Sequence, residues 1–593
     1  MTFTTRPDIA GTFGVVTSTH WIASAVGMGI LERGGNAFDA AVAAGFVLQV
    51  VEPHLNGPGG EFPAILRLAG DPAPRVLCAQ GVAPAGATIA QYRAQGLDAV
   101  PGSGLLASVV PGAFDGWMLL LRDHGTMTLR EVLGPAIYHA ERGHALLPRV
   151  AHTIAGLADF FAAEWPTSAA IWCPGGAAPQ PRALFANPAL AATWTRLLRE
   201  AETARGREAQ IEAARRIWSQ GFVAQAIDAF LRTSELMDGA GARRRGVLTG
   251  QDMAGWQAGY EDPVSHTYHG WEVFKTGPWG QGPVLLQSLA ILAHTAVAGM
   301  DTRSADFVHL VTEAMKLAYA DREAFYGDGA DVPLARLLSP DHTAARAALI
   351  GPRASLDQRP SRLAGFEALA EAAIARAQGA GGAAGIGGGE PTMAHLAERR
   401  GDTVHLDVID RLGNMIAVTP SGGWLQSSPA IPGLGFCLNT RAQMFWLEEG
   451  LPQSLAPGRR PRTTLSPSFA RGPGGEEMAF GTPGGDQQDQ WQLIWFLRMV
   501  HAGMGLQQAI DAPLFHTAHF TGSFAPRVAD PGSLVVEPAV GADVIADLRA
   551  RGHRVDVAED WSIGRLTAAR RGPDGLLTAA ATPRLMQAYA VGR

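Results

Sequence analysis

The sequence predicts a mixed α+β protein, and two kinds of pattern indicate this. Apolar residues recur at three- and four-residue spacing in long segments such as 306–325, which is typical of helices. Shorter segments such as 264–275 and 403–410 are apolar or alternate between apolar and polar residues, as β-strands do. The chain has 593 residues, more than one hydrophobic core usually holds, so we expect two or more packed units.

Helical and strand patterns alternate along the chain. Segment 21–51 is predicted to be a helical pair broken at the turn 34–36, because Asn36 can cap the second helix and Asp39 completes a capping box. Further helices are predicted over 127–231, 306–325, 493–500 and 506–512, and strands over 62–68, 76–79, 264–275, 403–410 and 415–419. Residues 376–402 are rich in glycine and alanine and are predicted to form a flexible linker.

The composition excludes several classes of function. A hydrophobic content of 47% and a charged content of 17% are those of an ordinary soluble globular protein. The net charge of −7 does not favour binding to nucleic acid or to an anionic membrane. The N-terminus lacks the apolar core of a signal peptide, and no apolar run is long enough to span a membrane. The three cysteines, Cys78, Cys173 and Cys437, have no metal-ligand spacing. We therefore expect a cytoplasmic protein without a metal or cofactor.

Thr403 is the first candidate catalytic residue, because it follows the predicted linker and begins a predicted strand. Cleavage of the Asp402–Thr403 bond would make it an N-terminal threonine, which carries a nucleophilic hydroxyl and a basic α-amine together. The ordinary pKa of such an amine is about 7.7–8.0, so it can accept a proton near neutral pH. The alternative is a structural threonine at a strand start.

A second candidate is the loop Gly481-Thr482-Pro483-Gly484-Gly485. Consecutive glycines after a proline can aim two backbone N–H groups at one point, and such donors stabilise the oxyanion of acyl transfer. The alternative is a plain turn. The common signatures of other enzymes, namely a P-loop, a Gly-x-Ser-x-Gly elbow and a His-Glu-x-x-His helix, do not occur in the sequence.

Taken together and in order, several motifs resemble those of the γ-glutamyltransferase family, from about residue 11 to the C-terminus. The segment Thr403-x-His405, with Asp410, Gly413-Asn414 and Thr419 after it, is similar to the region around the nucleophile of that family. The other matching segments are Gly34–Ala43, Pro111–Gly116, Ala318–Asp328, Arg462–Pro467 and Gly481–Gly485.

The resemblance implies an N-terminal-nucleophile hydrolase with a four-layer αββα fold. A precursor would cut itself into a large chain, 1–402, and a small chain, 403–593, which remain associated and pair into a dimer of such heterodimers. Thr403 would be the nucleophile and, through its amine, the base. Gly484 and Gly485 would form the oxyanion hole, Ser421 would supply a second hydroxyl, and Thr419 would support it.

The sequence departs from the family where a γ-glutamyl group would be held. Gln80 stands where the family has an arginine for the α-carboxylate, and Met444 stands where it has an aspartate for the α-amino group. Gly423 replaces an asparagine that contacts the ligand, and Thr463 and Thr464 replace two serines. Because a buried charged recognition pair contributes several kcal/mol, losing both ends argues against a γ-glutamyl substrate.

Segments 401–408, 420–429 and 435–446 look most like the oxamate amidohydrolase branch of the family. The resemblance implies hydrolysis of oxamate, or a similarly short carboxylate amide, to the acid and ammonia, a reaction of purine and allantoin breakdown. A pocket for oxamate needs a cation and little room. Arg441 is a candidate for the cation and Trp424 for filling space, although they are equally consistent with a surface arginine and a core residue. The alternatives are a γ-glutamyltransferase or glutathione hydrolase, and an uncleaved protein without catalytic activity.

Overall fold

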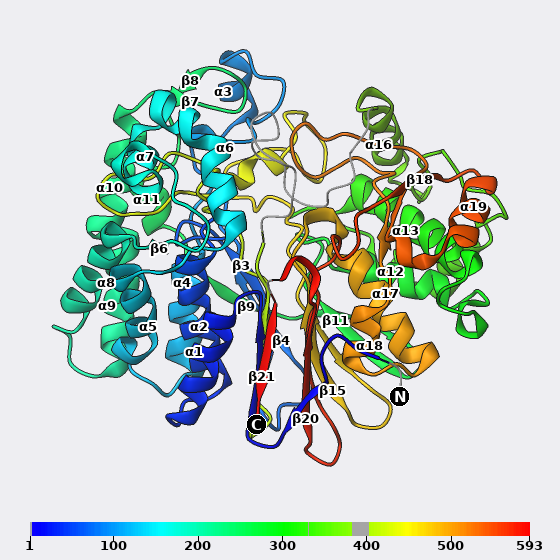
Figure 1. Cartoon of the computed structure of the whole chain (residues 1–593). Helices are drawn as coiled ribbons and strands as arrows, with labels where there is room; N and C mark the ends of the chain where they lie inside the picture. The colour runs from blue at the N-terminus through cyan, green and yellow to red at the C-terminus, as the bar shows by residue number, and fades with distance from the viewer. Residues whose placement is uncertain (1–2, 330, 382–402, 587) are drawn as a thin grey trace.

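The computed structural model describes residues 3–329, 331–381, 403–586 and 588–593. Two seven-stranded antiparallel sheets lie face to face at the centre, and helices cover the outer face of each sheet (Figure 1). This is a four-layer αββα sandwich, so the fold class implied by the resemblance is confirmed. None of the helices in these residue ranges combines the length and the apolar character needed to cross a membrane.

The first sheet places the strand after Thr403 at its centre. β12 pairs with β2 on one side and with β13 on the other, and strands from before and after position 403 lie side by side in one sheet. The strand order is β21 (Tyr589–Gly592), β2 (Gly14–Ser18), β12 (Leu406–Asp410), β13 (Met415–Val418), β3 (Phe62–Arg67), β4 (Arg75–Ala79) and β9 (Gly259–Glu261).

The second sheet is built from both parts of the chain in the same way. Its order is β1 (Ile9–Gly11), β20 (Leu577–Ala581), β19 (Thr567–Arg571), β15 (Glu477–Gly481), β14 (Ser468–Arg471), β11 (Trp271–Lys275) and β10 (Val264–Tyr268). A cut before Thr403 would therefore leave two chains that share both sheets. Their separation would break ladders in each sheet, which explains how the two chains would remain associated.

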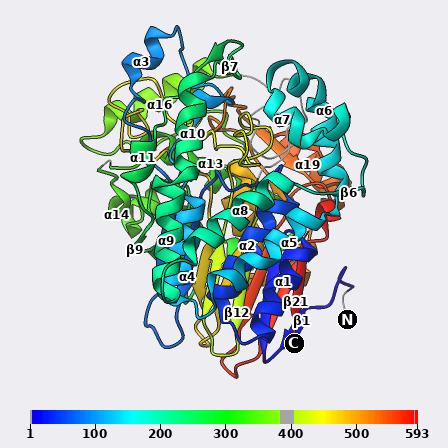
Figure 2. The same cartoon turned by 90° about the vertical axis from the view of Figure 1, so that its left-hand side faces the viewer.

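The outer layers bury apolar helices against the sheets. The Asn36–Asp39 capping box that the sequence predicts is confirmed at the start of α2, which is buried along its whole length. Helices α1 (Trp21–Glu32), α2 (Ala37–Val51), α4 (Ala113–His124) and α5 (Leu129–Arg142) lie on the side of the first sheet, as Figure 2 also shows. Helices α12 (Pro283–Leu292), α13 (Ala305–Phe325), α17 (Gln488–Ala502) and α18 (Leu506–Asp511) lie on the side of the second.

Smaller elements surround this core. The further helices are α3 (Ile89–Ala94), α6 (Pro148–Glu164), α7 (Pro166–Trp172), α8 (Pro188–Ala201), α9 (Arg207–Gln220), α10 (Phe222–Thr233), α11 (Gly250–Ala254), α14 (Leu334–Leu337), α15 (Pro340–Ala347), α16 (Glu367–Gly379) and α19 (Ala542–Ala550). The further strands are β5 (His144–Ala145), β6 (Leu184–Phe185), β7 (Leu236–Met237), β8 (Arg243–Arg244), β16 (Phe515–His516), β17 (Ser533–Val536) and β18 (Arg554–Val557).

Several boundaries differ from the sequence-based expectation. Helix α17 runs over Gln488–Ala502, whereas the sequence predicts a helix over 493–500, and the predicted strand 264–275 is divided into β10 and β11. Helix α16 includes residues 376–379, the start of the predicted linker, because its alanines Ala370, Ala373 and Ala377 pack inward. Residues 382–402 of that linker lie outside the described residues. The ladder of β12 begins at Leu406, whereas the sequence predicts a strand from Thr403. On the β13 side the chain opposite passes through Pro420, which lacks an N–H group. There, Val404 N donates to Pro420 O (3.0 Å) and Thr403 forms an isolated bridge, while on the β2 side Thr19 N donates to His405 O (3.2 Å).

Candidate active site

One edge of the sheet stack collects most of the predicted site residues. β12 and β3 begin at this edge, and β13 and β4 end there, because neighbouring strands run antiparallel. Thr403 bridges Ser421, and Ser421 bridges Glu61 on its other side. Residues directly opposite one another in antiparallel pairs project to the same face of a sheet. Thr403, Ser421 and Glu61 therefore share one face of this edge, and Gln80 follows the next strand end.

Thr403 and Ser421 bring two hydroxyl groups together. Both residues are buried, and Thr403 Oγ1 lies 3.4 Å from Ser421 Oγ. This separation is longer than an ordinary O–H···O hydrogen bond but short enough for one to form after a small shift. Ser421 therefore lies beside Thr403, and its role as the second hydroxyl stays a prediction. Asp402, on the other side of the predicted cleavage point, lies outside the described residues.

Thr419 contacts a different group. Its Oγ1 lies 2.8 Å from His405 Nδ1, and His405 Nε2 lies 2.9 Å from Asp407 Oδ1. The other carboxylate oxygen of Asp407 accepts hydrogen bonds from the hydroxyls of Thr17 and Thr567, each at 2.8 Å. Because Thr17 belongs to the first sheet and Thr567 to the second, this buried network ties the sheets together close to Thr403.

His405 also fixes the spacing between the sheets. A Cβ atom at Gly481, the last residue of β15, would overlap the His405 ring. The end of β15 is therefore held against the segment that carries Thr403. The chain continues from Gly481 through Thr482 and Pro483 to the two predicted oxyanion glycines, which consequently emerge at the same edge as Thr403.

Gly484 and Gly485 adopt backbone conformations that suit glycine. Their φ angles are +130° and +56°, and a Cβ at Gly484 would overlap the Trp491 ring. The loop leads directly into a 3₁₀ turn, Gly485–Gln487, and then into α17, so its N–H groups lie at the N-terminal end of a helix. Such an end favours a developing negative charge.

Arg441 is buried and paired with a carboxylate. It lies in the 3₁₀ turn Arg441–Met444, and its Nε donates a hydrogen bond to Glu61 Oε1. The guanidinium lies over the Trp424 ring, 5.1 Å from the centroid, and 5.8 Å from that of Phe524. Burial raises the pKa of Glu61, and the neighbouring Arg441 only partly offsets this. Arg441 is therefore not a surface residue, and its charge is shared with Glu61 beside Ser421.

The remaining predicted residues are all buried at or near this edge. Met444 Sδ lies 4.0 Å from Arg441 Nη1. The Trp424 indole N–H donates to Leu55 O (2.7 Å), which makes it part of the core as well as a wall for Arg441. Gly423 has φ +66° and passes close to the backbone of Gly60. Gln80, Thr463 and Thr464 are also buried; Gln80 Nε2 donates to Gly81 O (3.3 Å), and Thr463 O accepts from Gln281 N (2.9 Å).

Glu61 is the residue of this site that the sequence analysis misses. The available signal is a lone glutamate between Gly59-Gly60 and an apolar strand, a position where a buried charge requires a partner. Its partner lies 380 residues later in the chain, so no local pattern connects the two. The sequence analysis names His405 only as part of the motif around Thr403, and its contacts with Thr419 and Asp407 were not predicted.

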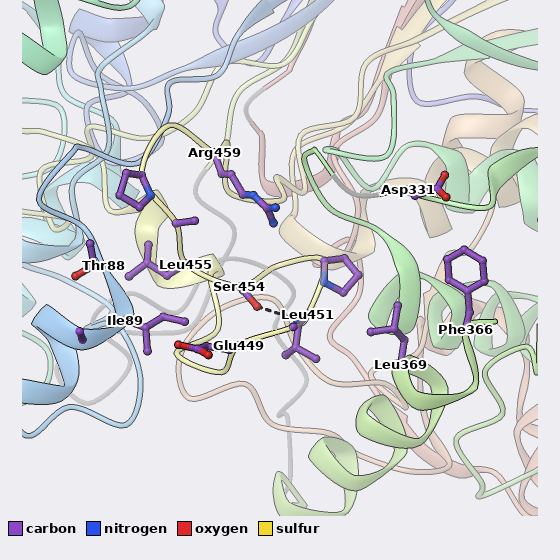
Figure 3. A pocket seen from close by; sticks show the side chains of 15 residues that line it. Thr88, Ile89, Asp331, Phe366, Leu369, Glu449, Leu451, Ser454, Leu455 and Arg459 are labelled. Carbon is purple, nitrogen blue, oxygen red and sulfur yellow. Dashed lines mark hydrogen bonds between the residues drawn. The ribbon is translucent and has the colours of Figure 1, made fainter.

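A cavity of the described residues lies away from this edge. Figure 3 shows this pocket of about 600 Å³, and none of the predicted site residues lines it. Its walls come from the starts of α3 and α16 and from the loop 449–459, where Ser454 Oγ accepts a hydrogen bond from Leu451 N (2.8 Å). The edge that carries Thr403 is closed in this structure, since Thr403 is fully buried.

Among the described residues, one group has side chains that could hold a metal ion: His309, Glu313 and His553. His309 Nδ1 lies 2.8 Å from His553 Nε2, and Glu313 pairs with Lys316 (2.6 Å) and Arg359 (2.8 Å). Because two cations already neutralise the carboxylate, a third positive charge would be repelled there. These contacts account for the cluster as a structural one.

Comparison with known proteins identifies the class. The family model described as gamma-glutamyltranspeptidase matches residues 23–592, so the chain belongs to this family of N-terminal-nucleophile hydrolases. Acylase ACY 1 proenzyme from Pseudomonas sp. (strain SE83) is 30% identical over 97% of this chain and 93% of its own length. Oxamate amidohydrolase proenzyme from Klebsiella pneumoniae subsp. pneumoniae is 31% identical over 97% of both chains.

Solved structures agree over the whole length. Two structures titled as LmbA2991, one of them a threonine-to-alanine variant, are 55% and 54% identical, cover 100% of both chains and have TM-scores of 0.93 and 0.92. A cephalosporin acylase from Bacillus halodurans is 25% identical, with a TM-score of 0.80, and the match covers 100% of this chain and 97% of that one. The chain is thus similar to hydrolases made as proenzymes.

Proposed function

We propose that this protein is a self-processing amidohydrolase whose nucleophile is Thr403, and that its substrate is oxamate or a similarly short amide bearing a carboxylate. The observation that carries the proposal is the Thr403–Ser421 hydroxyl pair, 3.4 Å apart, at the edge of the stack where the Gly484-Gly485 loop also emerges. Nucleophile, neighbouring hydroxyl and oxyanion donors are the parts that acyl transfer requires.

Processing would begin with the same hydroxyl. Thr403 Oγ1 attacks the carbonyl carbon of Asp402, the peptide C–N bond breaks, and the Asp402 acyl group moves from nitrogen to oxygen. Water then hydrolyses the ester, which releases the Asp402 carboxylate and leaves Thr403 with a free α-amine. That amine, with an ordinary pKa of about 7.7–8.0, is the base for turnover.

In turnover, the Thr403 amine accepts the hydroxyl proton as Oγ1 attacks the amide carbon. The N–H groups of Gly484 and Gly485 stabilise the oxyanion, and the amine returns the proton to the departing nitrogen, so that ammonia leaves. Water attacks the resulting ester and releases the acid. Ser421 lies where its hydroxyl can orient or relay the proton of Thr403 Oγ1.

A short acid is favoured by the surroundings of the nucleophile. Arg441 supplies a buried guanidinium close to Ser421, while Trp424, Met444 and Phe524 occupy the space around it. We therefore expect little room for a γ-glutamyl chain, and neither Gln80 nor Met444 carries the charge that would hold its ends. The similarity to oxamate amidohydrolase supports the same substrate class.

The test is ammonia release by the processed protein from oxamate, with the Thr403→Ala variant as the control. We expect turnover by the native protein and none by the variant. If oxamate is inert and another short amide is hydrolysed, the substrate proposal fails and the nucleophile proposal stands. If the native protein hydrolyses no short amide, the proposed activity is wrong.

A γ-glutamyl activity is the second candidate, because the matching family model is described by that reaction. It predicts release of p-nitroaniline from γ-glutamyl-p-nitroanilide and stimulation by an acceptor dipeptide. We expect neither, because both charged recognition groups are replaced, by Gln80 and Met444.

A further inference from the structure

The motif Ala318–Asp328 resembles a family motif, but the proposed chemistry gives it no task. In the structure it forms the C-terminal part of α13 and the residues after it. Tyr319 donates its hydroxyl hydrogen to Asp486 O (2.5 Å), and Asp486 directly follows the two glycines. The motif thus contacts the chain one residue beyond the predicted oxyanion hole.

Arg322 makes the main contact. Its side chain is fully buried, and Nη1 lies 2.5 Å from Asp486 Oδ1. The rings of Tyr319 and Phe520 stack on each other, and the guanidinium lies beside this pair, 4.6 Å from the centroid of Tyr319 and 4.9 Å from that of Phe520. Nη1 also donates to Gln281 Oε1 (2.8 Å). Because a guanidinium is planar and always charged, these contacts fix its position in the protein.

Asp486 is held from two directions. Its Oδ1 accepts from the hydroxyl of Ser523 (2.6 Å) and its Oδ2 from the N–H of Ser523 (2.9 Å), while Arg322 binds Oδ1. Burial alone would raise the pKa of this carboxyl, but Arg322 and Ser523 hold it below its ordinary value. The carboxylate is therefore a charged anchor for the loop.

Gln281 and Arg462 extend the anchor to the other loops of the site. Gln281 Nε2 donates to Gly485 O (3.2 Å), and Gln281 N donates to Thr463 O (2.9 Å). Arg462, just before Thr463, pairs with Glu323 (2.8 Å), which also pairs with Arg322 (2.8 Å). One buried cluster therefore positions the carbonyl of Gly485 and the backbone of Thr463 together.

We propose that Arg322 is a positioning residue that sets the geometry of the oxyanion hole through Asp486. Neither side chain is expected to touch the substrate. The φ angles of Gly484 and Gly485, +130° and +56°, belong to residues with wide conformational freedom, so the direction of their N–H groups depends on what holds the loop. The inference rests on the proposed function, because it assumes that these N–H groups face the reacting carbonyl.

The test measures acylation of Thr403 by p-nitrophenyl acetate, an activated ester that does not depend on recognition of the natural substrate. In stopped-flow experiments on processed protein, Asp486→Asn should lower the acylation rate constant by about 10- to 100-fold, since removing one oxyanion donor outright lowers rates by about 100- to 1,000-fold. The apparent affinity for the ester should change by less than about threefold, because the loop acts on the transition state.

Glu477→Gln is the matched control. Glu477 pairs with Arg67 in an equally buried carboxylate–arginine contact, but at the opposite edge of the sheets, where β15 begins and β3 ends. Glu477→Gln should alter the melting temperature without changing the acylation rate constant.

Arg322→Gln should lower the acylation rate constant as much as Asp486→Asn does. The variant with both substitutions should be no slower than either single variant, because the two residues act as one unit. If Asp486→Asn does not fold, Ser523→Ala removes a single contact to Asp486 and should give a smaller loss of the same kind.

The outcomes separate the two proposals. If native protein shows no acylation above the Thr403→Ala blank, the proposed function fails and this inference falls with it. If native protein is acylated and Asp486→Asn is as fast as Glu477→Gln, the proposed function stands and the positioning role of Arg322 is wrong. A loss confined to affinity would also overturn the positioning role.

Discussion

The guanidinium of Arg441 lies against the carboxylate of Glu61, and both side chains are fully buried beside Ser421. A buried ion pair is costly to break, because the remaining charge is left without compensation. Arg441→Met should therefore lower the free energy of unfolding of the Thr403→Ala precursor by about 3–5 kcal/mol, measured by urea denaturation. Glu61→Gln combined with Arg441→Met should recover most of this loss.

The same substitution tests acid recognition. Arg441→Met should lower kcat/KM for oxamate by about 30-fold or more, since losing one member of a buried charged contact costs about 2–5 kcal/mol. For oxamide, the neutral analogue of similar size, the loss should be below about threefold. Equal losses on both amides, or recovery of oxamate turnover in the double variant, would make Arg441 a structural residue only.

Ser421 and Thr419 should behave differently although they lie two residues apart. Ser421→Ala removes the hydroxyl 3.4 Å from Thr403 Oγ1, so it should slow self-cleavage and turnover by about 10-fold or more with little change in stability. Thr419→Val leaves His405 Nδ1 without its partner in a buried network and should cost about 1–3 kcal/mol of stability. Time courses of cleavage on denaturing gels would measure the first effect, and urea titrations of the uncut form would measure the second. A loss of stability in Ser421→Ala together with slow cleavage at normal stability in Thr419→Val would contradict this account.

Gly481 is predicted to tolerate no side chain. A Cβ there would overlap the His405 ring and force the two sheets apart, so Gly481→Ala should cost about 1–3 kcal/mol and slow self-cleavage. Gly29→Ala is the control: it lies inside α1, where a Cβ would meet no atom of another element within 4 Å, and it should leave cleavage unchanged while stabilising by up to about 1 kcal/mol. Normal cleavage in Gly481→Ala would show that the sheet spacing does not position the nucleophile.

Acid should weaken the fold through buried histidines. Burial lowers the pKa of His516, in β16, to about 3. Between that value and the ordinary pKa of about 6.5, the unfolded chain binds a proton that the folded chain does not. The contribution of His516 to the free energy of unfolding is therefore fully present above about pH 6.5 and decreases as the pH falls toward 3. At pH 5 the loss from this residue is about 2 kcal/mol. His516→Gln should reduce the pH dependence measured by urea unfolding between pH 7 and 5; an unchanged slope would contradict the assignment.

Local patterns in the sequence predicted much of the fold. The Asn36 capping box and helix α13 are confirmed, because capping and periodicity depend on residues close together in the chain. Strand structure over 264–275 is confirmed too, but the structure divides this segment into two paired strands, β10 and β11, where the sequence predicts one. The four-layer stacking was implied only by the resemblance, since it depends on pairings such as β12 with β2, nearly 400 residues apart. No local pattern determines which of many strands become neighbours.

The sequence predicted which residues are candidates for the site, but it predicted few of the contacts between them. Thr403, Ser421 and the Gly484-Gly485 loop come together at one edge, but their catalytic roles remain predictions. Arg441 could be named as a cation, whereas its burial against Glu61 could not be predicted, because the burial of an arginine depends on a distant partner. For the same reason the link from Arg322 to Asp486 was not visible. The dimer of heterodimers, the cytoplasmic location and the absence of a metal or cofactor also stay predictions.

The central claim is that Thr403 becomes an N-terminal nucleophile. N-terminal sequencing of the smaller band on a denaturing gel tests it most directly. The account predicts a sequence beginning Thr-Val-His-Leu-Asp, read from residue 403, and a single uncut band for Thr403→Ala. A small chain that begins at any other residue, or a fully active protein that stays in one piece, would contradict it.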